Sequence, residues 1–321
     1  MSSDRAGLGC MGMSGVYGPA DEAESIATIH AALDAGISLI DTGDFYAMGH
    51  NELLIGRALA DTPRDSYRLS VKFGAQRGPD GAPLGFDTRP AAVKTAAAYS
   101  LRRLGTDHID IYRPARLDPK VPIEETIGAI SELVDAGYVR AIGLSEMGAE
   151  TVRRAAAIHE IADLQIEYAI VSRGIERAIL PACRELGIDI TAYGILSRGL
   201  LTDHFRPERA PEPGDIRGRF PRFSGENAER NAELVERLRA IAAQRGVSVQ
   251  QLAIAWVRSR GDDIVPLIGA RRRDQLNEAL AALELTLSDD ELEAIERAVP
   301  DGAIAGTRYG QAQMADLDSE R

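Results

Sequence analysis

A recurring unit of helix, glycine and short apolar strand constrains the fold of this chain more than any other feature. In its first clear copy, apolar residues recur at helical spacing over 26–33, Gly36 follows, and residues 37–41 form an apolar run. Glycine readily takes the left-handed conformation that ends a helix, and nearly continuous apolar runs are typical of strands covered on both faces. The same order returns around Gly105, Gly137 and Gly187.

Helices that alternate with such strands predict a parallel sheet built from right-handed crossovers. We expect strands at 8–11, 37–42, 67–73, 109–113, 138–144, 163–168, 188–193 and 264–268. Eight strands with intervening helices in 321 residues predict an α/β protein with one domain over residues 1–321, a (β/α)8 TIM barrel. The alternative, a doubly wound sheet, requires a Gly-x-Gly-x-x-Gly motif after the first strand, and residues 8–13 lack that spacing.

The composition argues against several classes of partner. Asp and Glu outnumber Lys and Arg by 49 to 37, and the net charge of −12 disfavours binding to nucleic acid or to an anionic membrane. Cys10 and Cys183 show no metal-ligand spacing, so both are expected to be reduced packing residues. The amino terminus lacks the features of a signal peptide, and no apolar run reaches the roughly 18 residues of a membrane span. We therefore expect a cytoplasmic protein without a bound metal, and the sequence leaves its oligomeric state open.

Residues 195–225 break the alternation of helices and strands. They are rich in Gly, Pro and Arg and show no periodic apolar face. Long loops inside compact domains are often functional. We therefore expect this segment to form a lid or cofactor loop at the mouth of the barrel.

Polar residues gather where the expected strands end, which is where the active sites of such barrels lie. Asp41 and Tyr46 follow the second expected strand, and Lys72 lies near the end of the third. A Lys beside a Tyr would lower the pKa of the phenol, and Asp41 would keep the Lys charged, so that Tyr46 could donate a proton near neutral pH. A structural Asp41–Lys72 ion pair, with Tyr46 as a packing residue, is the alternative, and these residues alone leave both open.

Several separated motifs resemble the aldo-keto reductase family over nearly the whole chain. The matching stretches are 9–14, 39–46, 49–56, 143–145, 165–168, 198–202, 266–272 and 275–278. The resemblance implies a TIM barrel that reduces carbonyl compounds with NADPH. It also implies catalytic roles for three residues, with Tyr46 as general acid, Lys72 as its pKa-lowering neighbour and Asp41 as the partner of Lys72.

The fourth catalytic position of that family departs from the pattern. The family has a histidine in a Tyr-x-x-His-Arg pattern, whereas this chain has Ala115 between Tyr112 and Arg116. Loss of one carbonyl-polarising group typically costs a few kcal/mol of transition-state stabilisation, but it leaves the hydride donor and the proton donor in place. His50 and His204 lie in loops and are expected to be solvated, so neither is expected to substitute. The smaller side chain also leaves room for a bulkier substrate.

The resemblance further implies a cofactor site. Ser145 and Gln165 would hold the nicotinamide carboxamide and Tyr193 would stack on the ring, while Glu146 stands where the family often has Asn. The remaining implied contacts, to the pyrophosphate and the adenosine end, are Leu196, Arg198, Gly199, Gly269, Ala270, Arg271, Arg272, Gln275 and Glu278.

The arginine run 271–273 favours NADPH over NADH. A guanidinium pairs with the 2′-phosphate of NADPH, whereas a site for NAD presents a carboxylate to the ribose. A solvated start of a helix is the alternative interpretation of such a short basic run. Ala279 stands where the family often has Asn, which removes one implied contact to adenine.

We therefore expect NADPH-dependent reduction of a small aldehyde or ketone to an alcohol. Two alternatives stay open. Because family members with an altered histidine position include regulatory subunits, the chain could be an NADPH-binding redox-sensing or regulatory protein with little turnover. It could also reduce a C=C bond, a C=N bond or a vitamin-type aldehyde. A metal-dependent barrel hydrolase is disfavoured, because five scattered histidines form no metal-ligating cluster.

Overall fold

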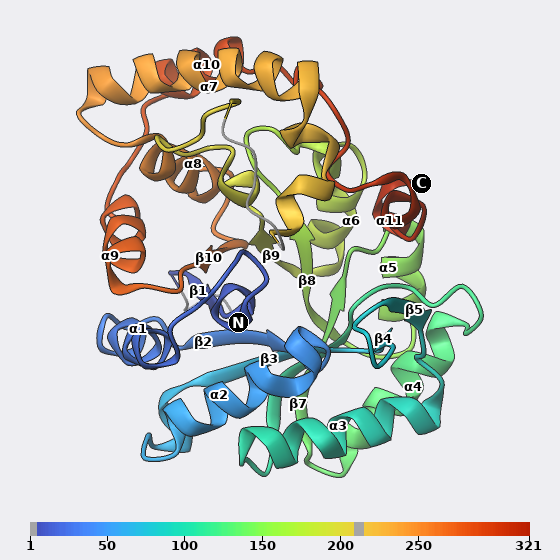
Figure 1. Ribbon diagram of the computed structural model, residues 1–321. Coiled ribbons are helices and arrows are strands. Elements are labelled where there is room, and N and C mark those ends of the chain that lie inside the picture. Colours follow the sequence, from blue (N-terminus) through green and yellow to red (C-terminus); the bar gives the residue numbers. More distant parts are fainter. Residues whose placement is uncertain (1–4, 209–214) are drawn as a thin grey trace.

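Eight parallel strands close into a barrel in the computed structural model, which describes residues 5–208 and 215–321 (Figure 1). Around the barrel the order is β1, β10, β9, β8, β7, β6, β3 and β2. Their bounds are β1 Gly7–Gly9, β2 Leu39–Gly43, β3 Arg68–Phe73, β6 Ile109–Pro114, β7 Val139–Ser145, β8 Ile161–Glu167, β9 Asp189–Tyr193 and β10 Ile264–Gly269. The predicted barrel is confirmed. The first strand is shorter than expected, because Cys10 enters a 3-10 turn over Met11–Ser14.

Helices surround the barrel, and those that follow the strands give it the alternation expected from the sequence (Figure 1). Gly105 and Gly187 end α3 and α6 at φ of 68° and 69°, and Gly36 and Gly137 follow the ends of α1 and α4 at φ of 82° and 81°. The helices are α1 Glu22–Asp34, α2 His50–Leu59, α3 Pro90–Leu104, α4 Ile123–Asp135, α5 Ala149–Ala156, α6 Ile179–Leu186, α7 Gly225–Arg245, α8 Val249–Arg258, α9 Arg273–Ala282, α10 Asp289–Ala298 and α11 Gln311–Ala315.

Two segments lie outside the repeating pattern. An antiparallel hairpin of β4 Ala75–Arg77 and β5 Pro83–Phe86, which the periodicity did not predict, follows β3. The segment predicted as a lid contains 3-10 turns at Ser197–Gly199, Ile216–Arg219 and Pro221–Phe223 before α7 begins, and its residues 209–214 lie outside the described part of the chain. Its role as a lid stays a prediction.

Apolar side chains fill the space between the strands and the helices. Ile40, Val71 and Ile142 come from the strands, and Trp256 of α8 is fully buried with its ring 5.4 Å from that of Tyr168. Cys10 and Cys183 are buried and unpaired, as expected of packing cysteines. No helix within the described ranges is long and apolar enough to cross a membrane.

Strand register sets the positions of the polar residues at the carboxyl ends of the strands. Asp41 of β2 lies beside Ser70 of β3, and Lys72 lies two residues further along the same strand. On the other side of the barrel, Ser145 ends β7 beside Gln165 of β8. Residues far apart in the sequence are thereby brought to one end of the barrel.

Candidate active site

Asp41 is the centre of a buried polar cluster at this end of the barrel. Its Oδ1 accepts a hydrogen bond from Lys72 Nζ at 2.5 Å, and both side chains are buried. Its Oδ2 accepts hydrogen bonds at 2.7 Å from Ser70 Oγ and from Gln165 Nε2. The carboxylate is thus fixed by three donors from β3 and β8, and it holds Lys72 in one position.

Tyr46 lies directly beside this pair. The ammonium nitrogen of Lys72 is 5.2 Å from the centre of the Tyr46 ring. The turn that follows the tyrosine contains Ala47 and Met48 with φ of 46° and 55°, a backbone conformation that is costly for residues other than glycine. Such strain is often found at functional sites, where the surrounding structure holds it.

The protonation of Tyr46 differs from the sequence-based expectation. Burial and the nearby Asp41 carboxylate hold the pKa of the Tyr46 phenol well above its ordinary value. Arg116 is the cation that acts most strongly in the opposite direction. Burial likewise lowers the pKa of Lys72, although Asp41 opposes that shift. Removal of the phenol from water therefore outweighs the nearby positive charge, so that its pKa is raised overall where a lowered pKa was expected.

The position of the missing histidine is well defined. Ala115 follows β6, is buried, and donates a backbone hydrogen bond to the carbonyl oxygen of Phe73 at 2.8 Å. The His50 ring bonds Ser14 and Glu22 on the outer side of the site, and His204 is exposed. Neither imidazole therefore replaces the absent one in this structure, as expected.

Ser145 and Gln165 lie side by side on β7 and β8. Ser145 Oγ is buried and has no hydrogen-bond partner among the described residues. A buried polar atom without a partner is costly, so an orphaned hydroxyl in such a place fits a site that a ligand completes. Gln165 lies next to it in register, and its bond to Asp41 orients its side chain.

Tyr193 is tied into a second buried cluster around Glu146. Its hydroxyl donates to Glu146 Oε1 at 2.7 Å and lies 2.9 Å from the hydroxyl of Tyr309. Arg308 makes two hydrogen bonds to the same carboxylate, at 2.7 and 2.5 Å, and Ser319 Oγ makes a third at 2.6 Å. Arg308 and these hydrogen bonds hold the pKa of Glu146 well below its usual range although burial raises it. Glu146 therefore anchors the carboxyl-terminal segment to the barrel.

Arg308, Tyr309 and Ser319 were not identified from the sequence. They lie in the last turns of the chain, where no strand or periodic helix marks them, and α11 lies beside α5 in Figure 1. The backbone N–H of Gly148, just before α5, donates to Asp318 at 2.8 Å, which confirms that contact. The one available signal was Glu146 itself, since a carboxylate at the end of a buried strand requires a cation.

The residues assigned to the pyrophosphate lie in the same region. Arg198 donates to Glu167 Oε2 at 2.9 Å, and its guanidinium carbon lies 4.3 Å from the ring centre of Tyr309 and 4.8 Å from that of Phe220. Gly199 follows it in the 3-10 turn Ser197–Gly199, and Leu196 comes just before that turn. The structure thus places the Arg198 guanidinium against two aromatic rings that also contact each other, with its charge paired to a carboxylate.

The residues assigned to the adenosine end follow β10 and begin α9. Arg271 donates to the carbonyl oxygens of Tyr17 and Gly18 at 3.2 Å, and its backbone N–H donates to Gln275 at 3.1 Å. Arg272 is exposed and pairs with Asp274 at 3.0 Å. Elsewhere, Gly269 ends β10, Ala270 is buried, and Glu278 accepts from Ser248 at 2.7 Å. Arg271 therefore connects α9 to the loop after β1, whereas Arg272 points to solvent.

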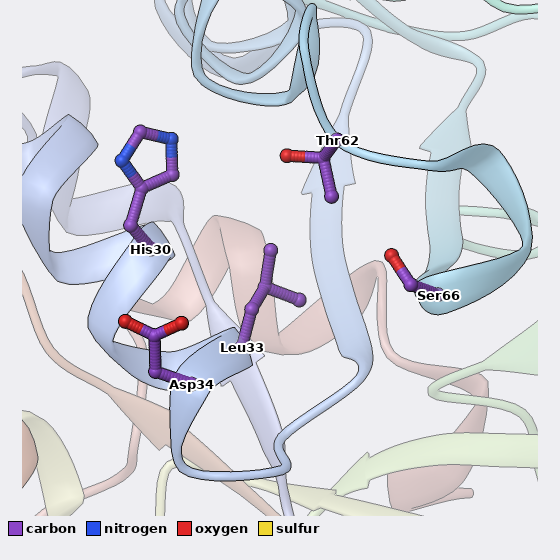
Figure 2. Close-up of a pocket in the computed structure, with 5 residues that line it drawn as sticks. All are labelled: His30, Leu33, Asp34, Thr62 and Ser66. Atoms are coloured by element: carbon purple, nitrogen blue, oxygen red, sulfur yellow. The ribbon is translucent and has the colours of Figure 1, made fainter.

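A pocket on another surface does not belong to this site. It measures about 290 Å³ and is lined by His30, Leu33, Asp34, Thr62 and Ser66 (Figure 2). These residues precede β2 and β3, so the pocket lies at the amino ends of the strands, opposite Asp41 and Lys72. The described residues also hold no group of three or more His, Cys, Asp or Glu side chains that could bind a metal ion.

Comparison with known proteins agrees with this geometry. The aldo/keto reductase family matches residues 5–300. A probable aldo-keto reductase from Glycine max is 41% identical, with 95% of this chain and 88% of that protein covered. An aldo-keto reductase from Schizosaccharomyces pombe, whose name includes NADP(+), is 39% identical, with coverage of 94% and 90%.

Solved structures show the same relationship. The glycerol dehydrogenase from Gluconobacter oxydans superposes with a TM-score of 0.83 at 32% identity, with 92% of this chain and 93% of that chain covered. A thermostable aldo-keto reductase in complex with the inhibitor epalrestat gives 0.71 at 26% identity, with coverage of 92% and 94%. The polar cluster at the carboxyl ends of the strands, the barrel and these matches together establish that the chain belongs to the aldo/keto reductase family of oxidoreductases.

Proposed function

We propose that this protein reduces a small aldehyde or ketone to an alcohol with NADPH, and that Tyr46 is the general acid. The observation that carries the proposal is the buried Asp41–Lys72 pair, whose ammonium nitrogen lies 5.2 Å from the Tyr46 ring. A structural ion pair needs no phenol beside it. The raised pKa of Tyr46 keeps the phenol protonated at neutral pH, the state required to donate a proton.

Each residue of the cluster has a defined task in this proposal. Bound NADPH supplies the hydride. Ser145, whose hydroxyl lacks a partner among the described residues, and Gln165 hold the carboxamide, and Tyr193 offers its ring to the nicotinamide. Lys72 places a positive charge beside the phenol, which stabilises negative charge left on its oxygen after proton donation. Asp41 fixes the position of Lys72.

The choice of NADPH is supported by the arginines at the start of α9 and by the NADP(+) in the name of the yeast relative. Arg271 is held by hydrogen bonds to the loop after β1, whereas Arg272 pairs with Asp274 at the surface. We expect Arg271→Ala and Arg272→Ala to weaken NADPH binding about tenfold or more while changing NADH binding little. The exposed Arg102→Ala on α3 serves as the charge-matched control. Equal weakening of both nucleotides would remove the argument for the 2′-phosphate.

The direct test is NADPH consumption with a panel of aldehydes, ketones and imines, with Tyr46→Phe beside the wild type. We expect the variant to lose activity by about 10²-fold or more, while nucleotide binding, followed by fluorescence, is kept. Tyr138→Phe, at an exposed tyrosine, controls for the loss of a hydroxyl. Full activity of Tyr46→Phe would overturn the assignment of the acid. Nucleotide binding without turnover on any substrate would favour a regulatory role, for which the absent histidine at position 115 is the supporting observation.

A further inference from the structure

Four buried cations inside the barrel and at its carboxyl end are paired with carboxylates. The pairs and their shortest nitrogen–oxygen distances are Lys72–Asp41 at 2.5 Å, Arg113–Asp163 at 3.0 Å, Arg198–Glu167 at 2.9 Å and Arg308–Glu146 at 2.5 Å. All eight side chains are buried. Buried charges are normally paired in this way, because an unpaired charge removed from water is strongly disfavoured.

Arg116, which comes directly after Ala115, differs from these four cations. It makes no ion pair with any carboxylate of the described residues, and its hydrogen bond is local, from one guanidinium nitrogen to the carbonyl oxygen of Ala115 at 2.5 Å. The side chain is partly buried. A guanidinium offers five N–H donors in a planar fork, so most of its donors remain free to bind another group.

Arg116 comes two residues after the end of β6, so it lies at the carboxyl end of the barrel, where Tyr46 and Lys72 also lie. It is the strongest of the cations that act on Tyr46, and it also acts on Lys72. From the other side of the mouth, Tyr193, Tyr309 and the Glu146 carboxylate favour the charged form of Arg116, but Glu146 makes its ion pair with Arg308. Arg116 therefore lies close enough to Tyr46, the proposed proton donor, and to Tyr193, the proposed nicotinamide contact, to interact with both electrostatically.

The neighbouring residue, Ala115, stands where the family has its histidine. An alanine offers no donor with which to orient a carbonyl group, and its small side chain leaves space beside the arginine. A guanidinium fork binds a carboxylate or phosphate with two parallel hydrogen bonds, which fixes orientation as well as affinity. An anchor at the distal end of a substrate can thus supply positioning that the missing imidazole does not.

We propose that Arg116 binds an anionic group, carboxylate or phosphate, on the carbonyl substrate, and so selects negatively charged aldehydes or ketones. This inference rests on the proposed reductase function and names its substrate class. Arg116 acts as a specificity-determining residue. Transfer of hydride and proton takes place at the carbonyl carbon and oxygen, and the anionic group at the arginine is unchanged.

A matched pair of substrates tests the proposal. 4-Carboxybenzaldehyde and methyl 4-formylbenzoate share one reacting aldehyde and differ in the charge at the far end, and 4-formylphenyl phosphate distinguishes phosphate from carboxylate. We expect the wild type to favour at least one anion over the neutral ester by about tenfold to a hundredfold in kcat/KM, because hydrogen bonds to a charged group typically change affinity by about that factor. Added salt, from about 0.02 M to about 0.5 M, should raise KM for the anion only.

The variants locate the preference at Arg116. We expect Arg116→Gln to reduce the ratio of kcat/KM values to about one, with the change mainly in KM for the anion. Arg116→Lys should keep part of the ratio, because it keeps the charge but loses the fork. The exposed Arg102→Gln is the matched control and should leave the ratio as in the wild type. A wild-type ratio near one, or an unchanged ratio in Arg116→Gln, would overturn the proposal. An equal fall in kcat for both substrates would also overturn it, because Arg116 would then act on the carbonyl itself.

A binding measurement separates this proposal from the proposed function. 4-(Hydroxymethyl)benzoate and its methyl ester are the alcohol products, and calorimetric titration into the NADPH-loaded protein measures their affinity without turnover. We expect tighter binding of the acid to the wild type and loss of that difference in Arg116→Gln. Selective binding without reduction of any aldehyde would refute the reductase and retain the anion site. Reduction without selective binding would refute the anion site alone.

Discussion

The buried ion pair of Asp41 and Lys72 predicts how substitutions at these two residues change the free energy of unfolding. Asp41→Asn preserves the shape of the side chain but removes its charge, so Lys72 is left as an uncompensated buried cation. The asparagine also replaces one carboxylate oxygen with an amide nitrogen, so it loses an acceptor for Lys72 or for the two donors Ser70 and Gln165.

The size of the effect follows from this geometry. Removing one partner of a buried ion pair costs about 3–5 kcal/mol, because the other charge stays out of water. Lys72→Met, which leaves Asp41 unpaired, should cost a similar amount. The double variant removes both charges, so we expect its loss of unfolding free energy to be far smaller than the sum of the two single losses.

Urea unfolding of the wild type, both single variants and the double variant measures the coupling between the two residues. Glu185→Gln, which breaks the exposed Arg153–Glu185 pair, is the control and should cost no more than about 1 kcal/mol. If the double variant loses the sum of the single losses to within about 0.5 kcal/mol, the two charges are independent and the reasoning is refuted.

The same variant should depend on pH in a defined direction. Burial already lowers the pKa of Lys72, and Asp41 opposes that shift. Without the Asp41 charge, the folded-state pKa falls further below the unfolded value, so the unfolded chain binds more protons in that interval. Stability then rises with pH, and the deficit of Asp41→Asn should shrink between about pH 7 and pH 10. A deficit that grows over this range would contradict the assignment of the charge to Lys72.

Two further predictions concern two helical glycines and the carboxyl group of Asp44. A Cβ at Gly56 would lie 2.6 Å from the carbonyl oxygen of Arg103, so Gly56→Ala should lower the free energy of unfolding by about 1–3 kcal/mol. Gly128→Ala, where a Cβ meets nothing within 4 Å, should instead be stabilising by roughly 0.5–1 kcal/mol, and urea midpoints would distinguish the two. Burial and the nearby Glu52 raise the pKa of Asp44 to about 7. The folded state therefore holds this proton more tightly, and stability is lost as pH rises from about 4 to about 7. Asp44→Asn should match the wild type near pH 4 in thermal melts and exceed its melting temperature near pH 8; an equal melting temperature at both would reject a raised pKa.

The sequence by itself determined the barrel, because the signals for it are local. A glycine such as Gly187 ends a helix through its own backbone freedom, and the apolar run after it forms a strand whatever lies elsewhere in the chain. Once the alternation fixes a parallel barrel, the carboxyl ends of the strands must meet at one mouth. The sequence therefore suffices to place Asp41, Lys72 and Gln165 together.

Only the tertiary structure decided how charges near the site are paired. Glu146 and Arg308 are 162 residues apart, and no local pattern relates a strand end to the last turns of the chain. The direction of the Tyr46 pKa shift also required the fold, because it is the sum of burial and of charges on residues far apart in the sequence, such as Asp41 and Arg116. The lack of a carboxylate partner for Arg116 within the described residues could be found only after every neighbouring carboxylate had been located. Local backbone preferences therefore specify the scaffold, whereas desolvation and long-range pairing, which depend on the whole fold, specify the electrostatics of the site.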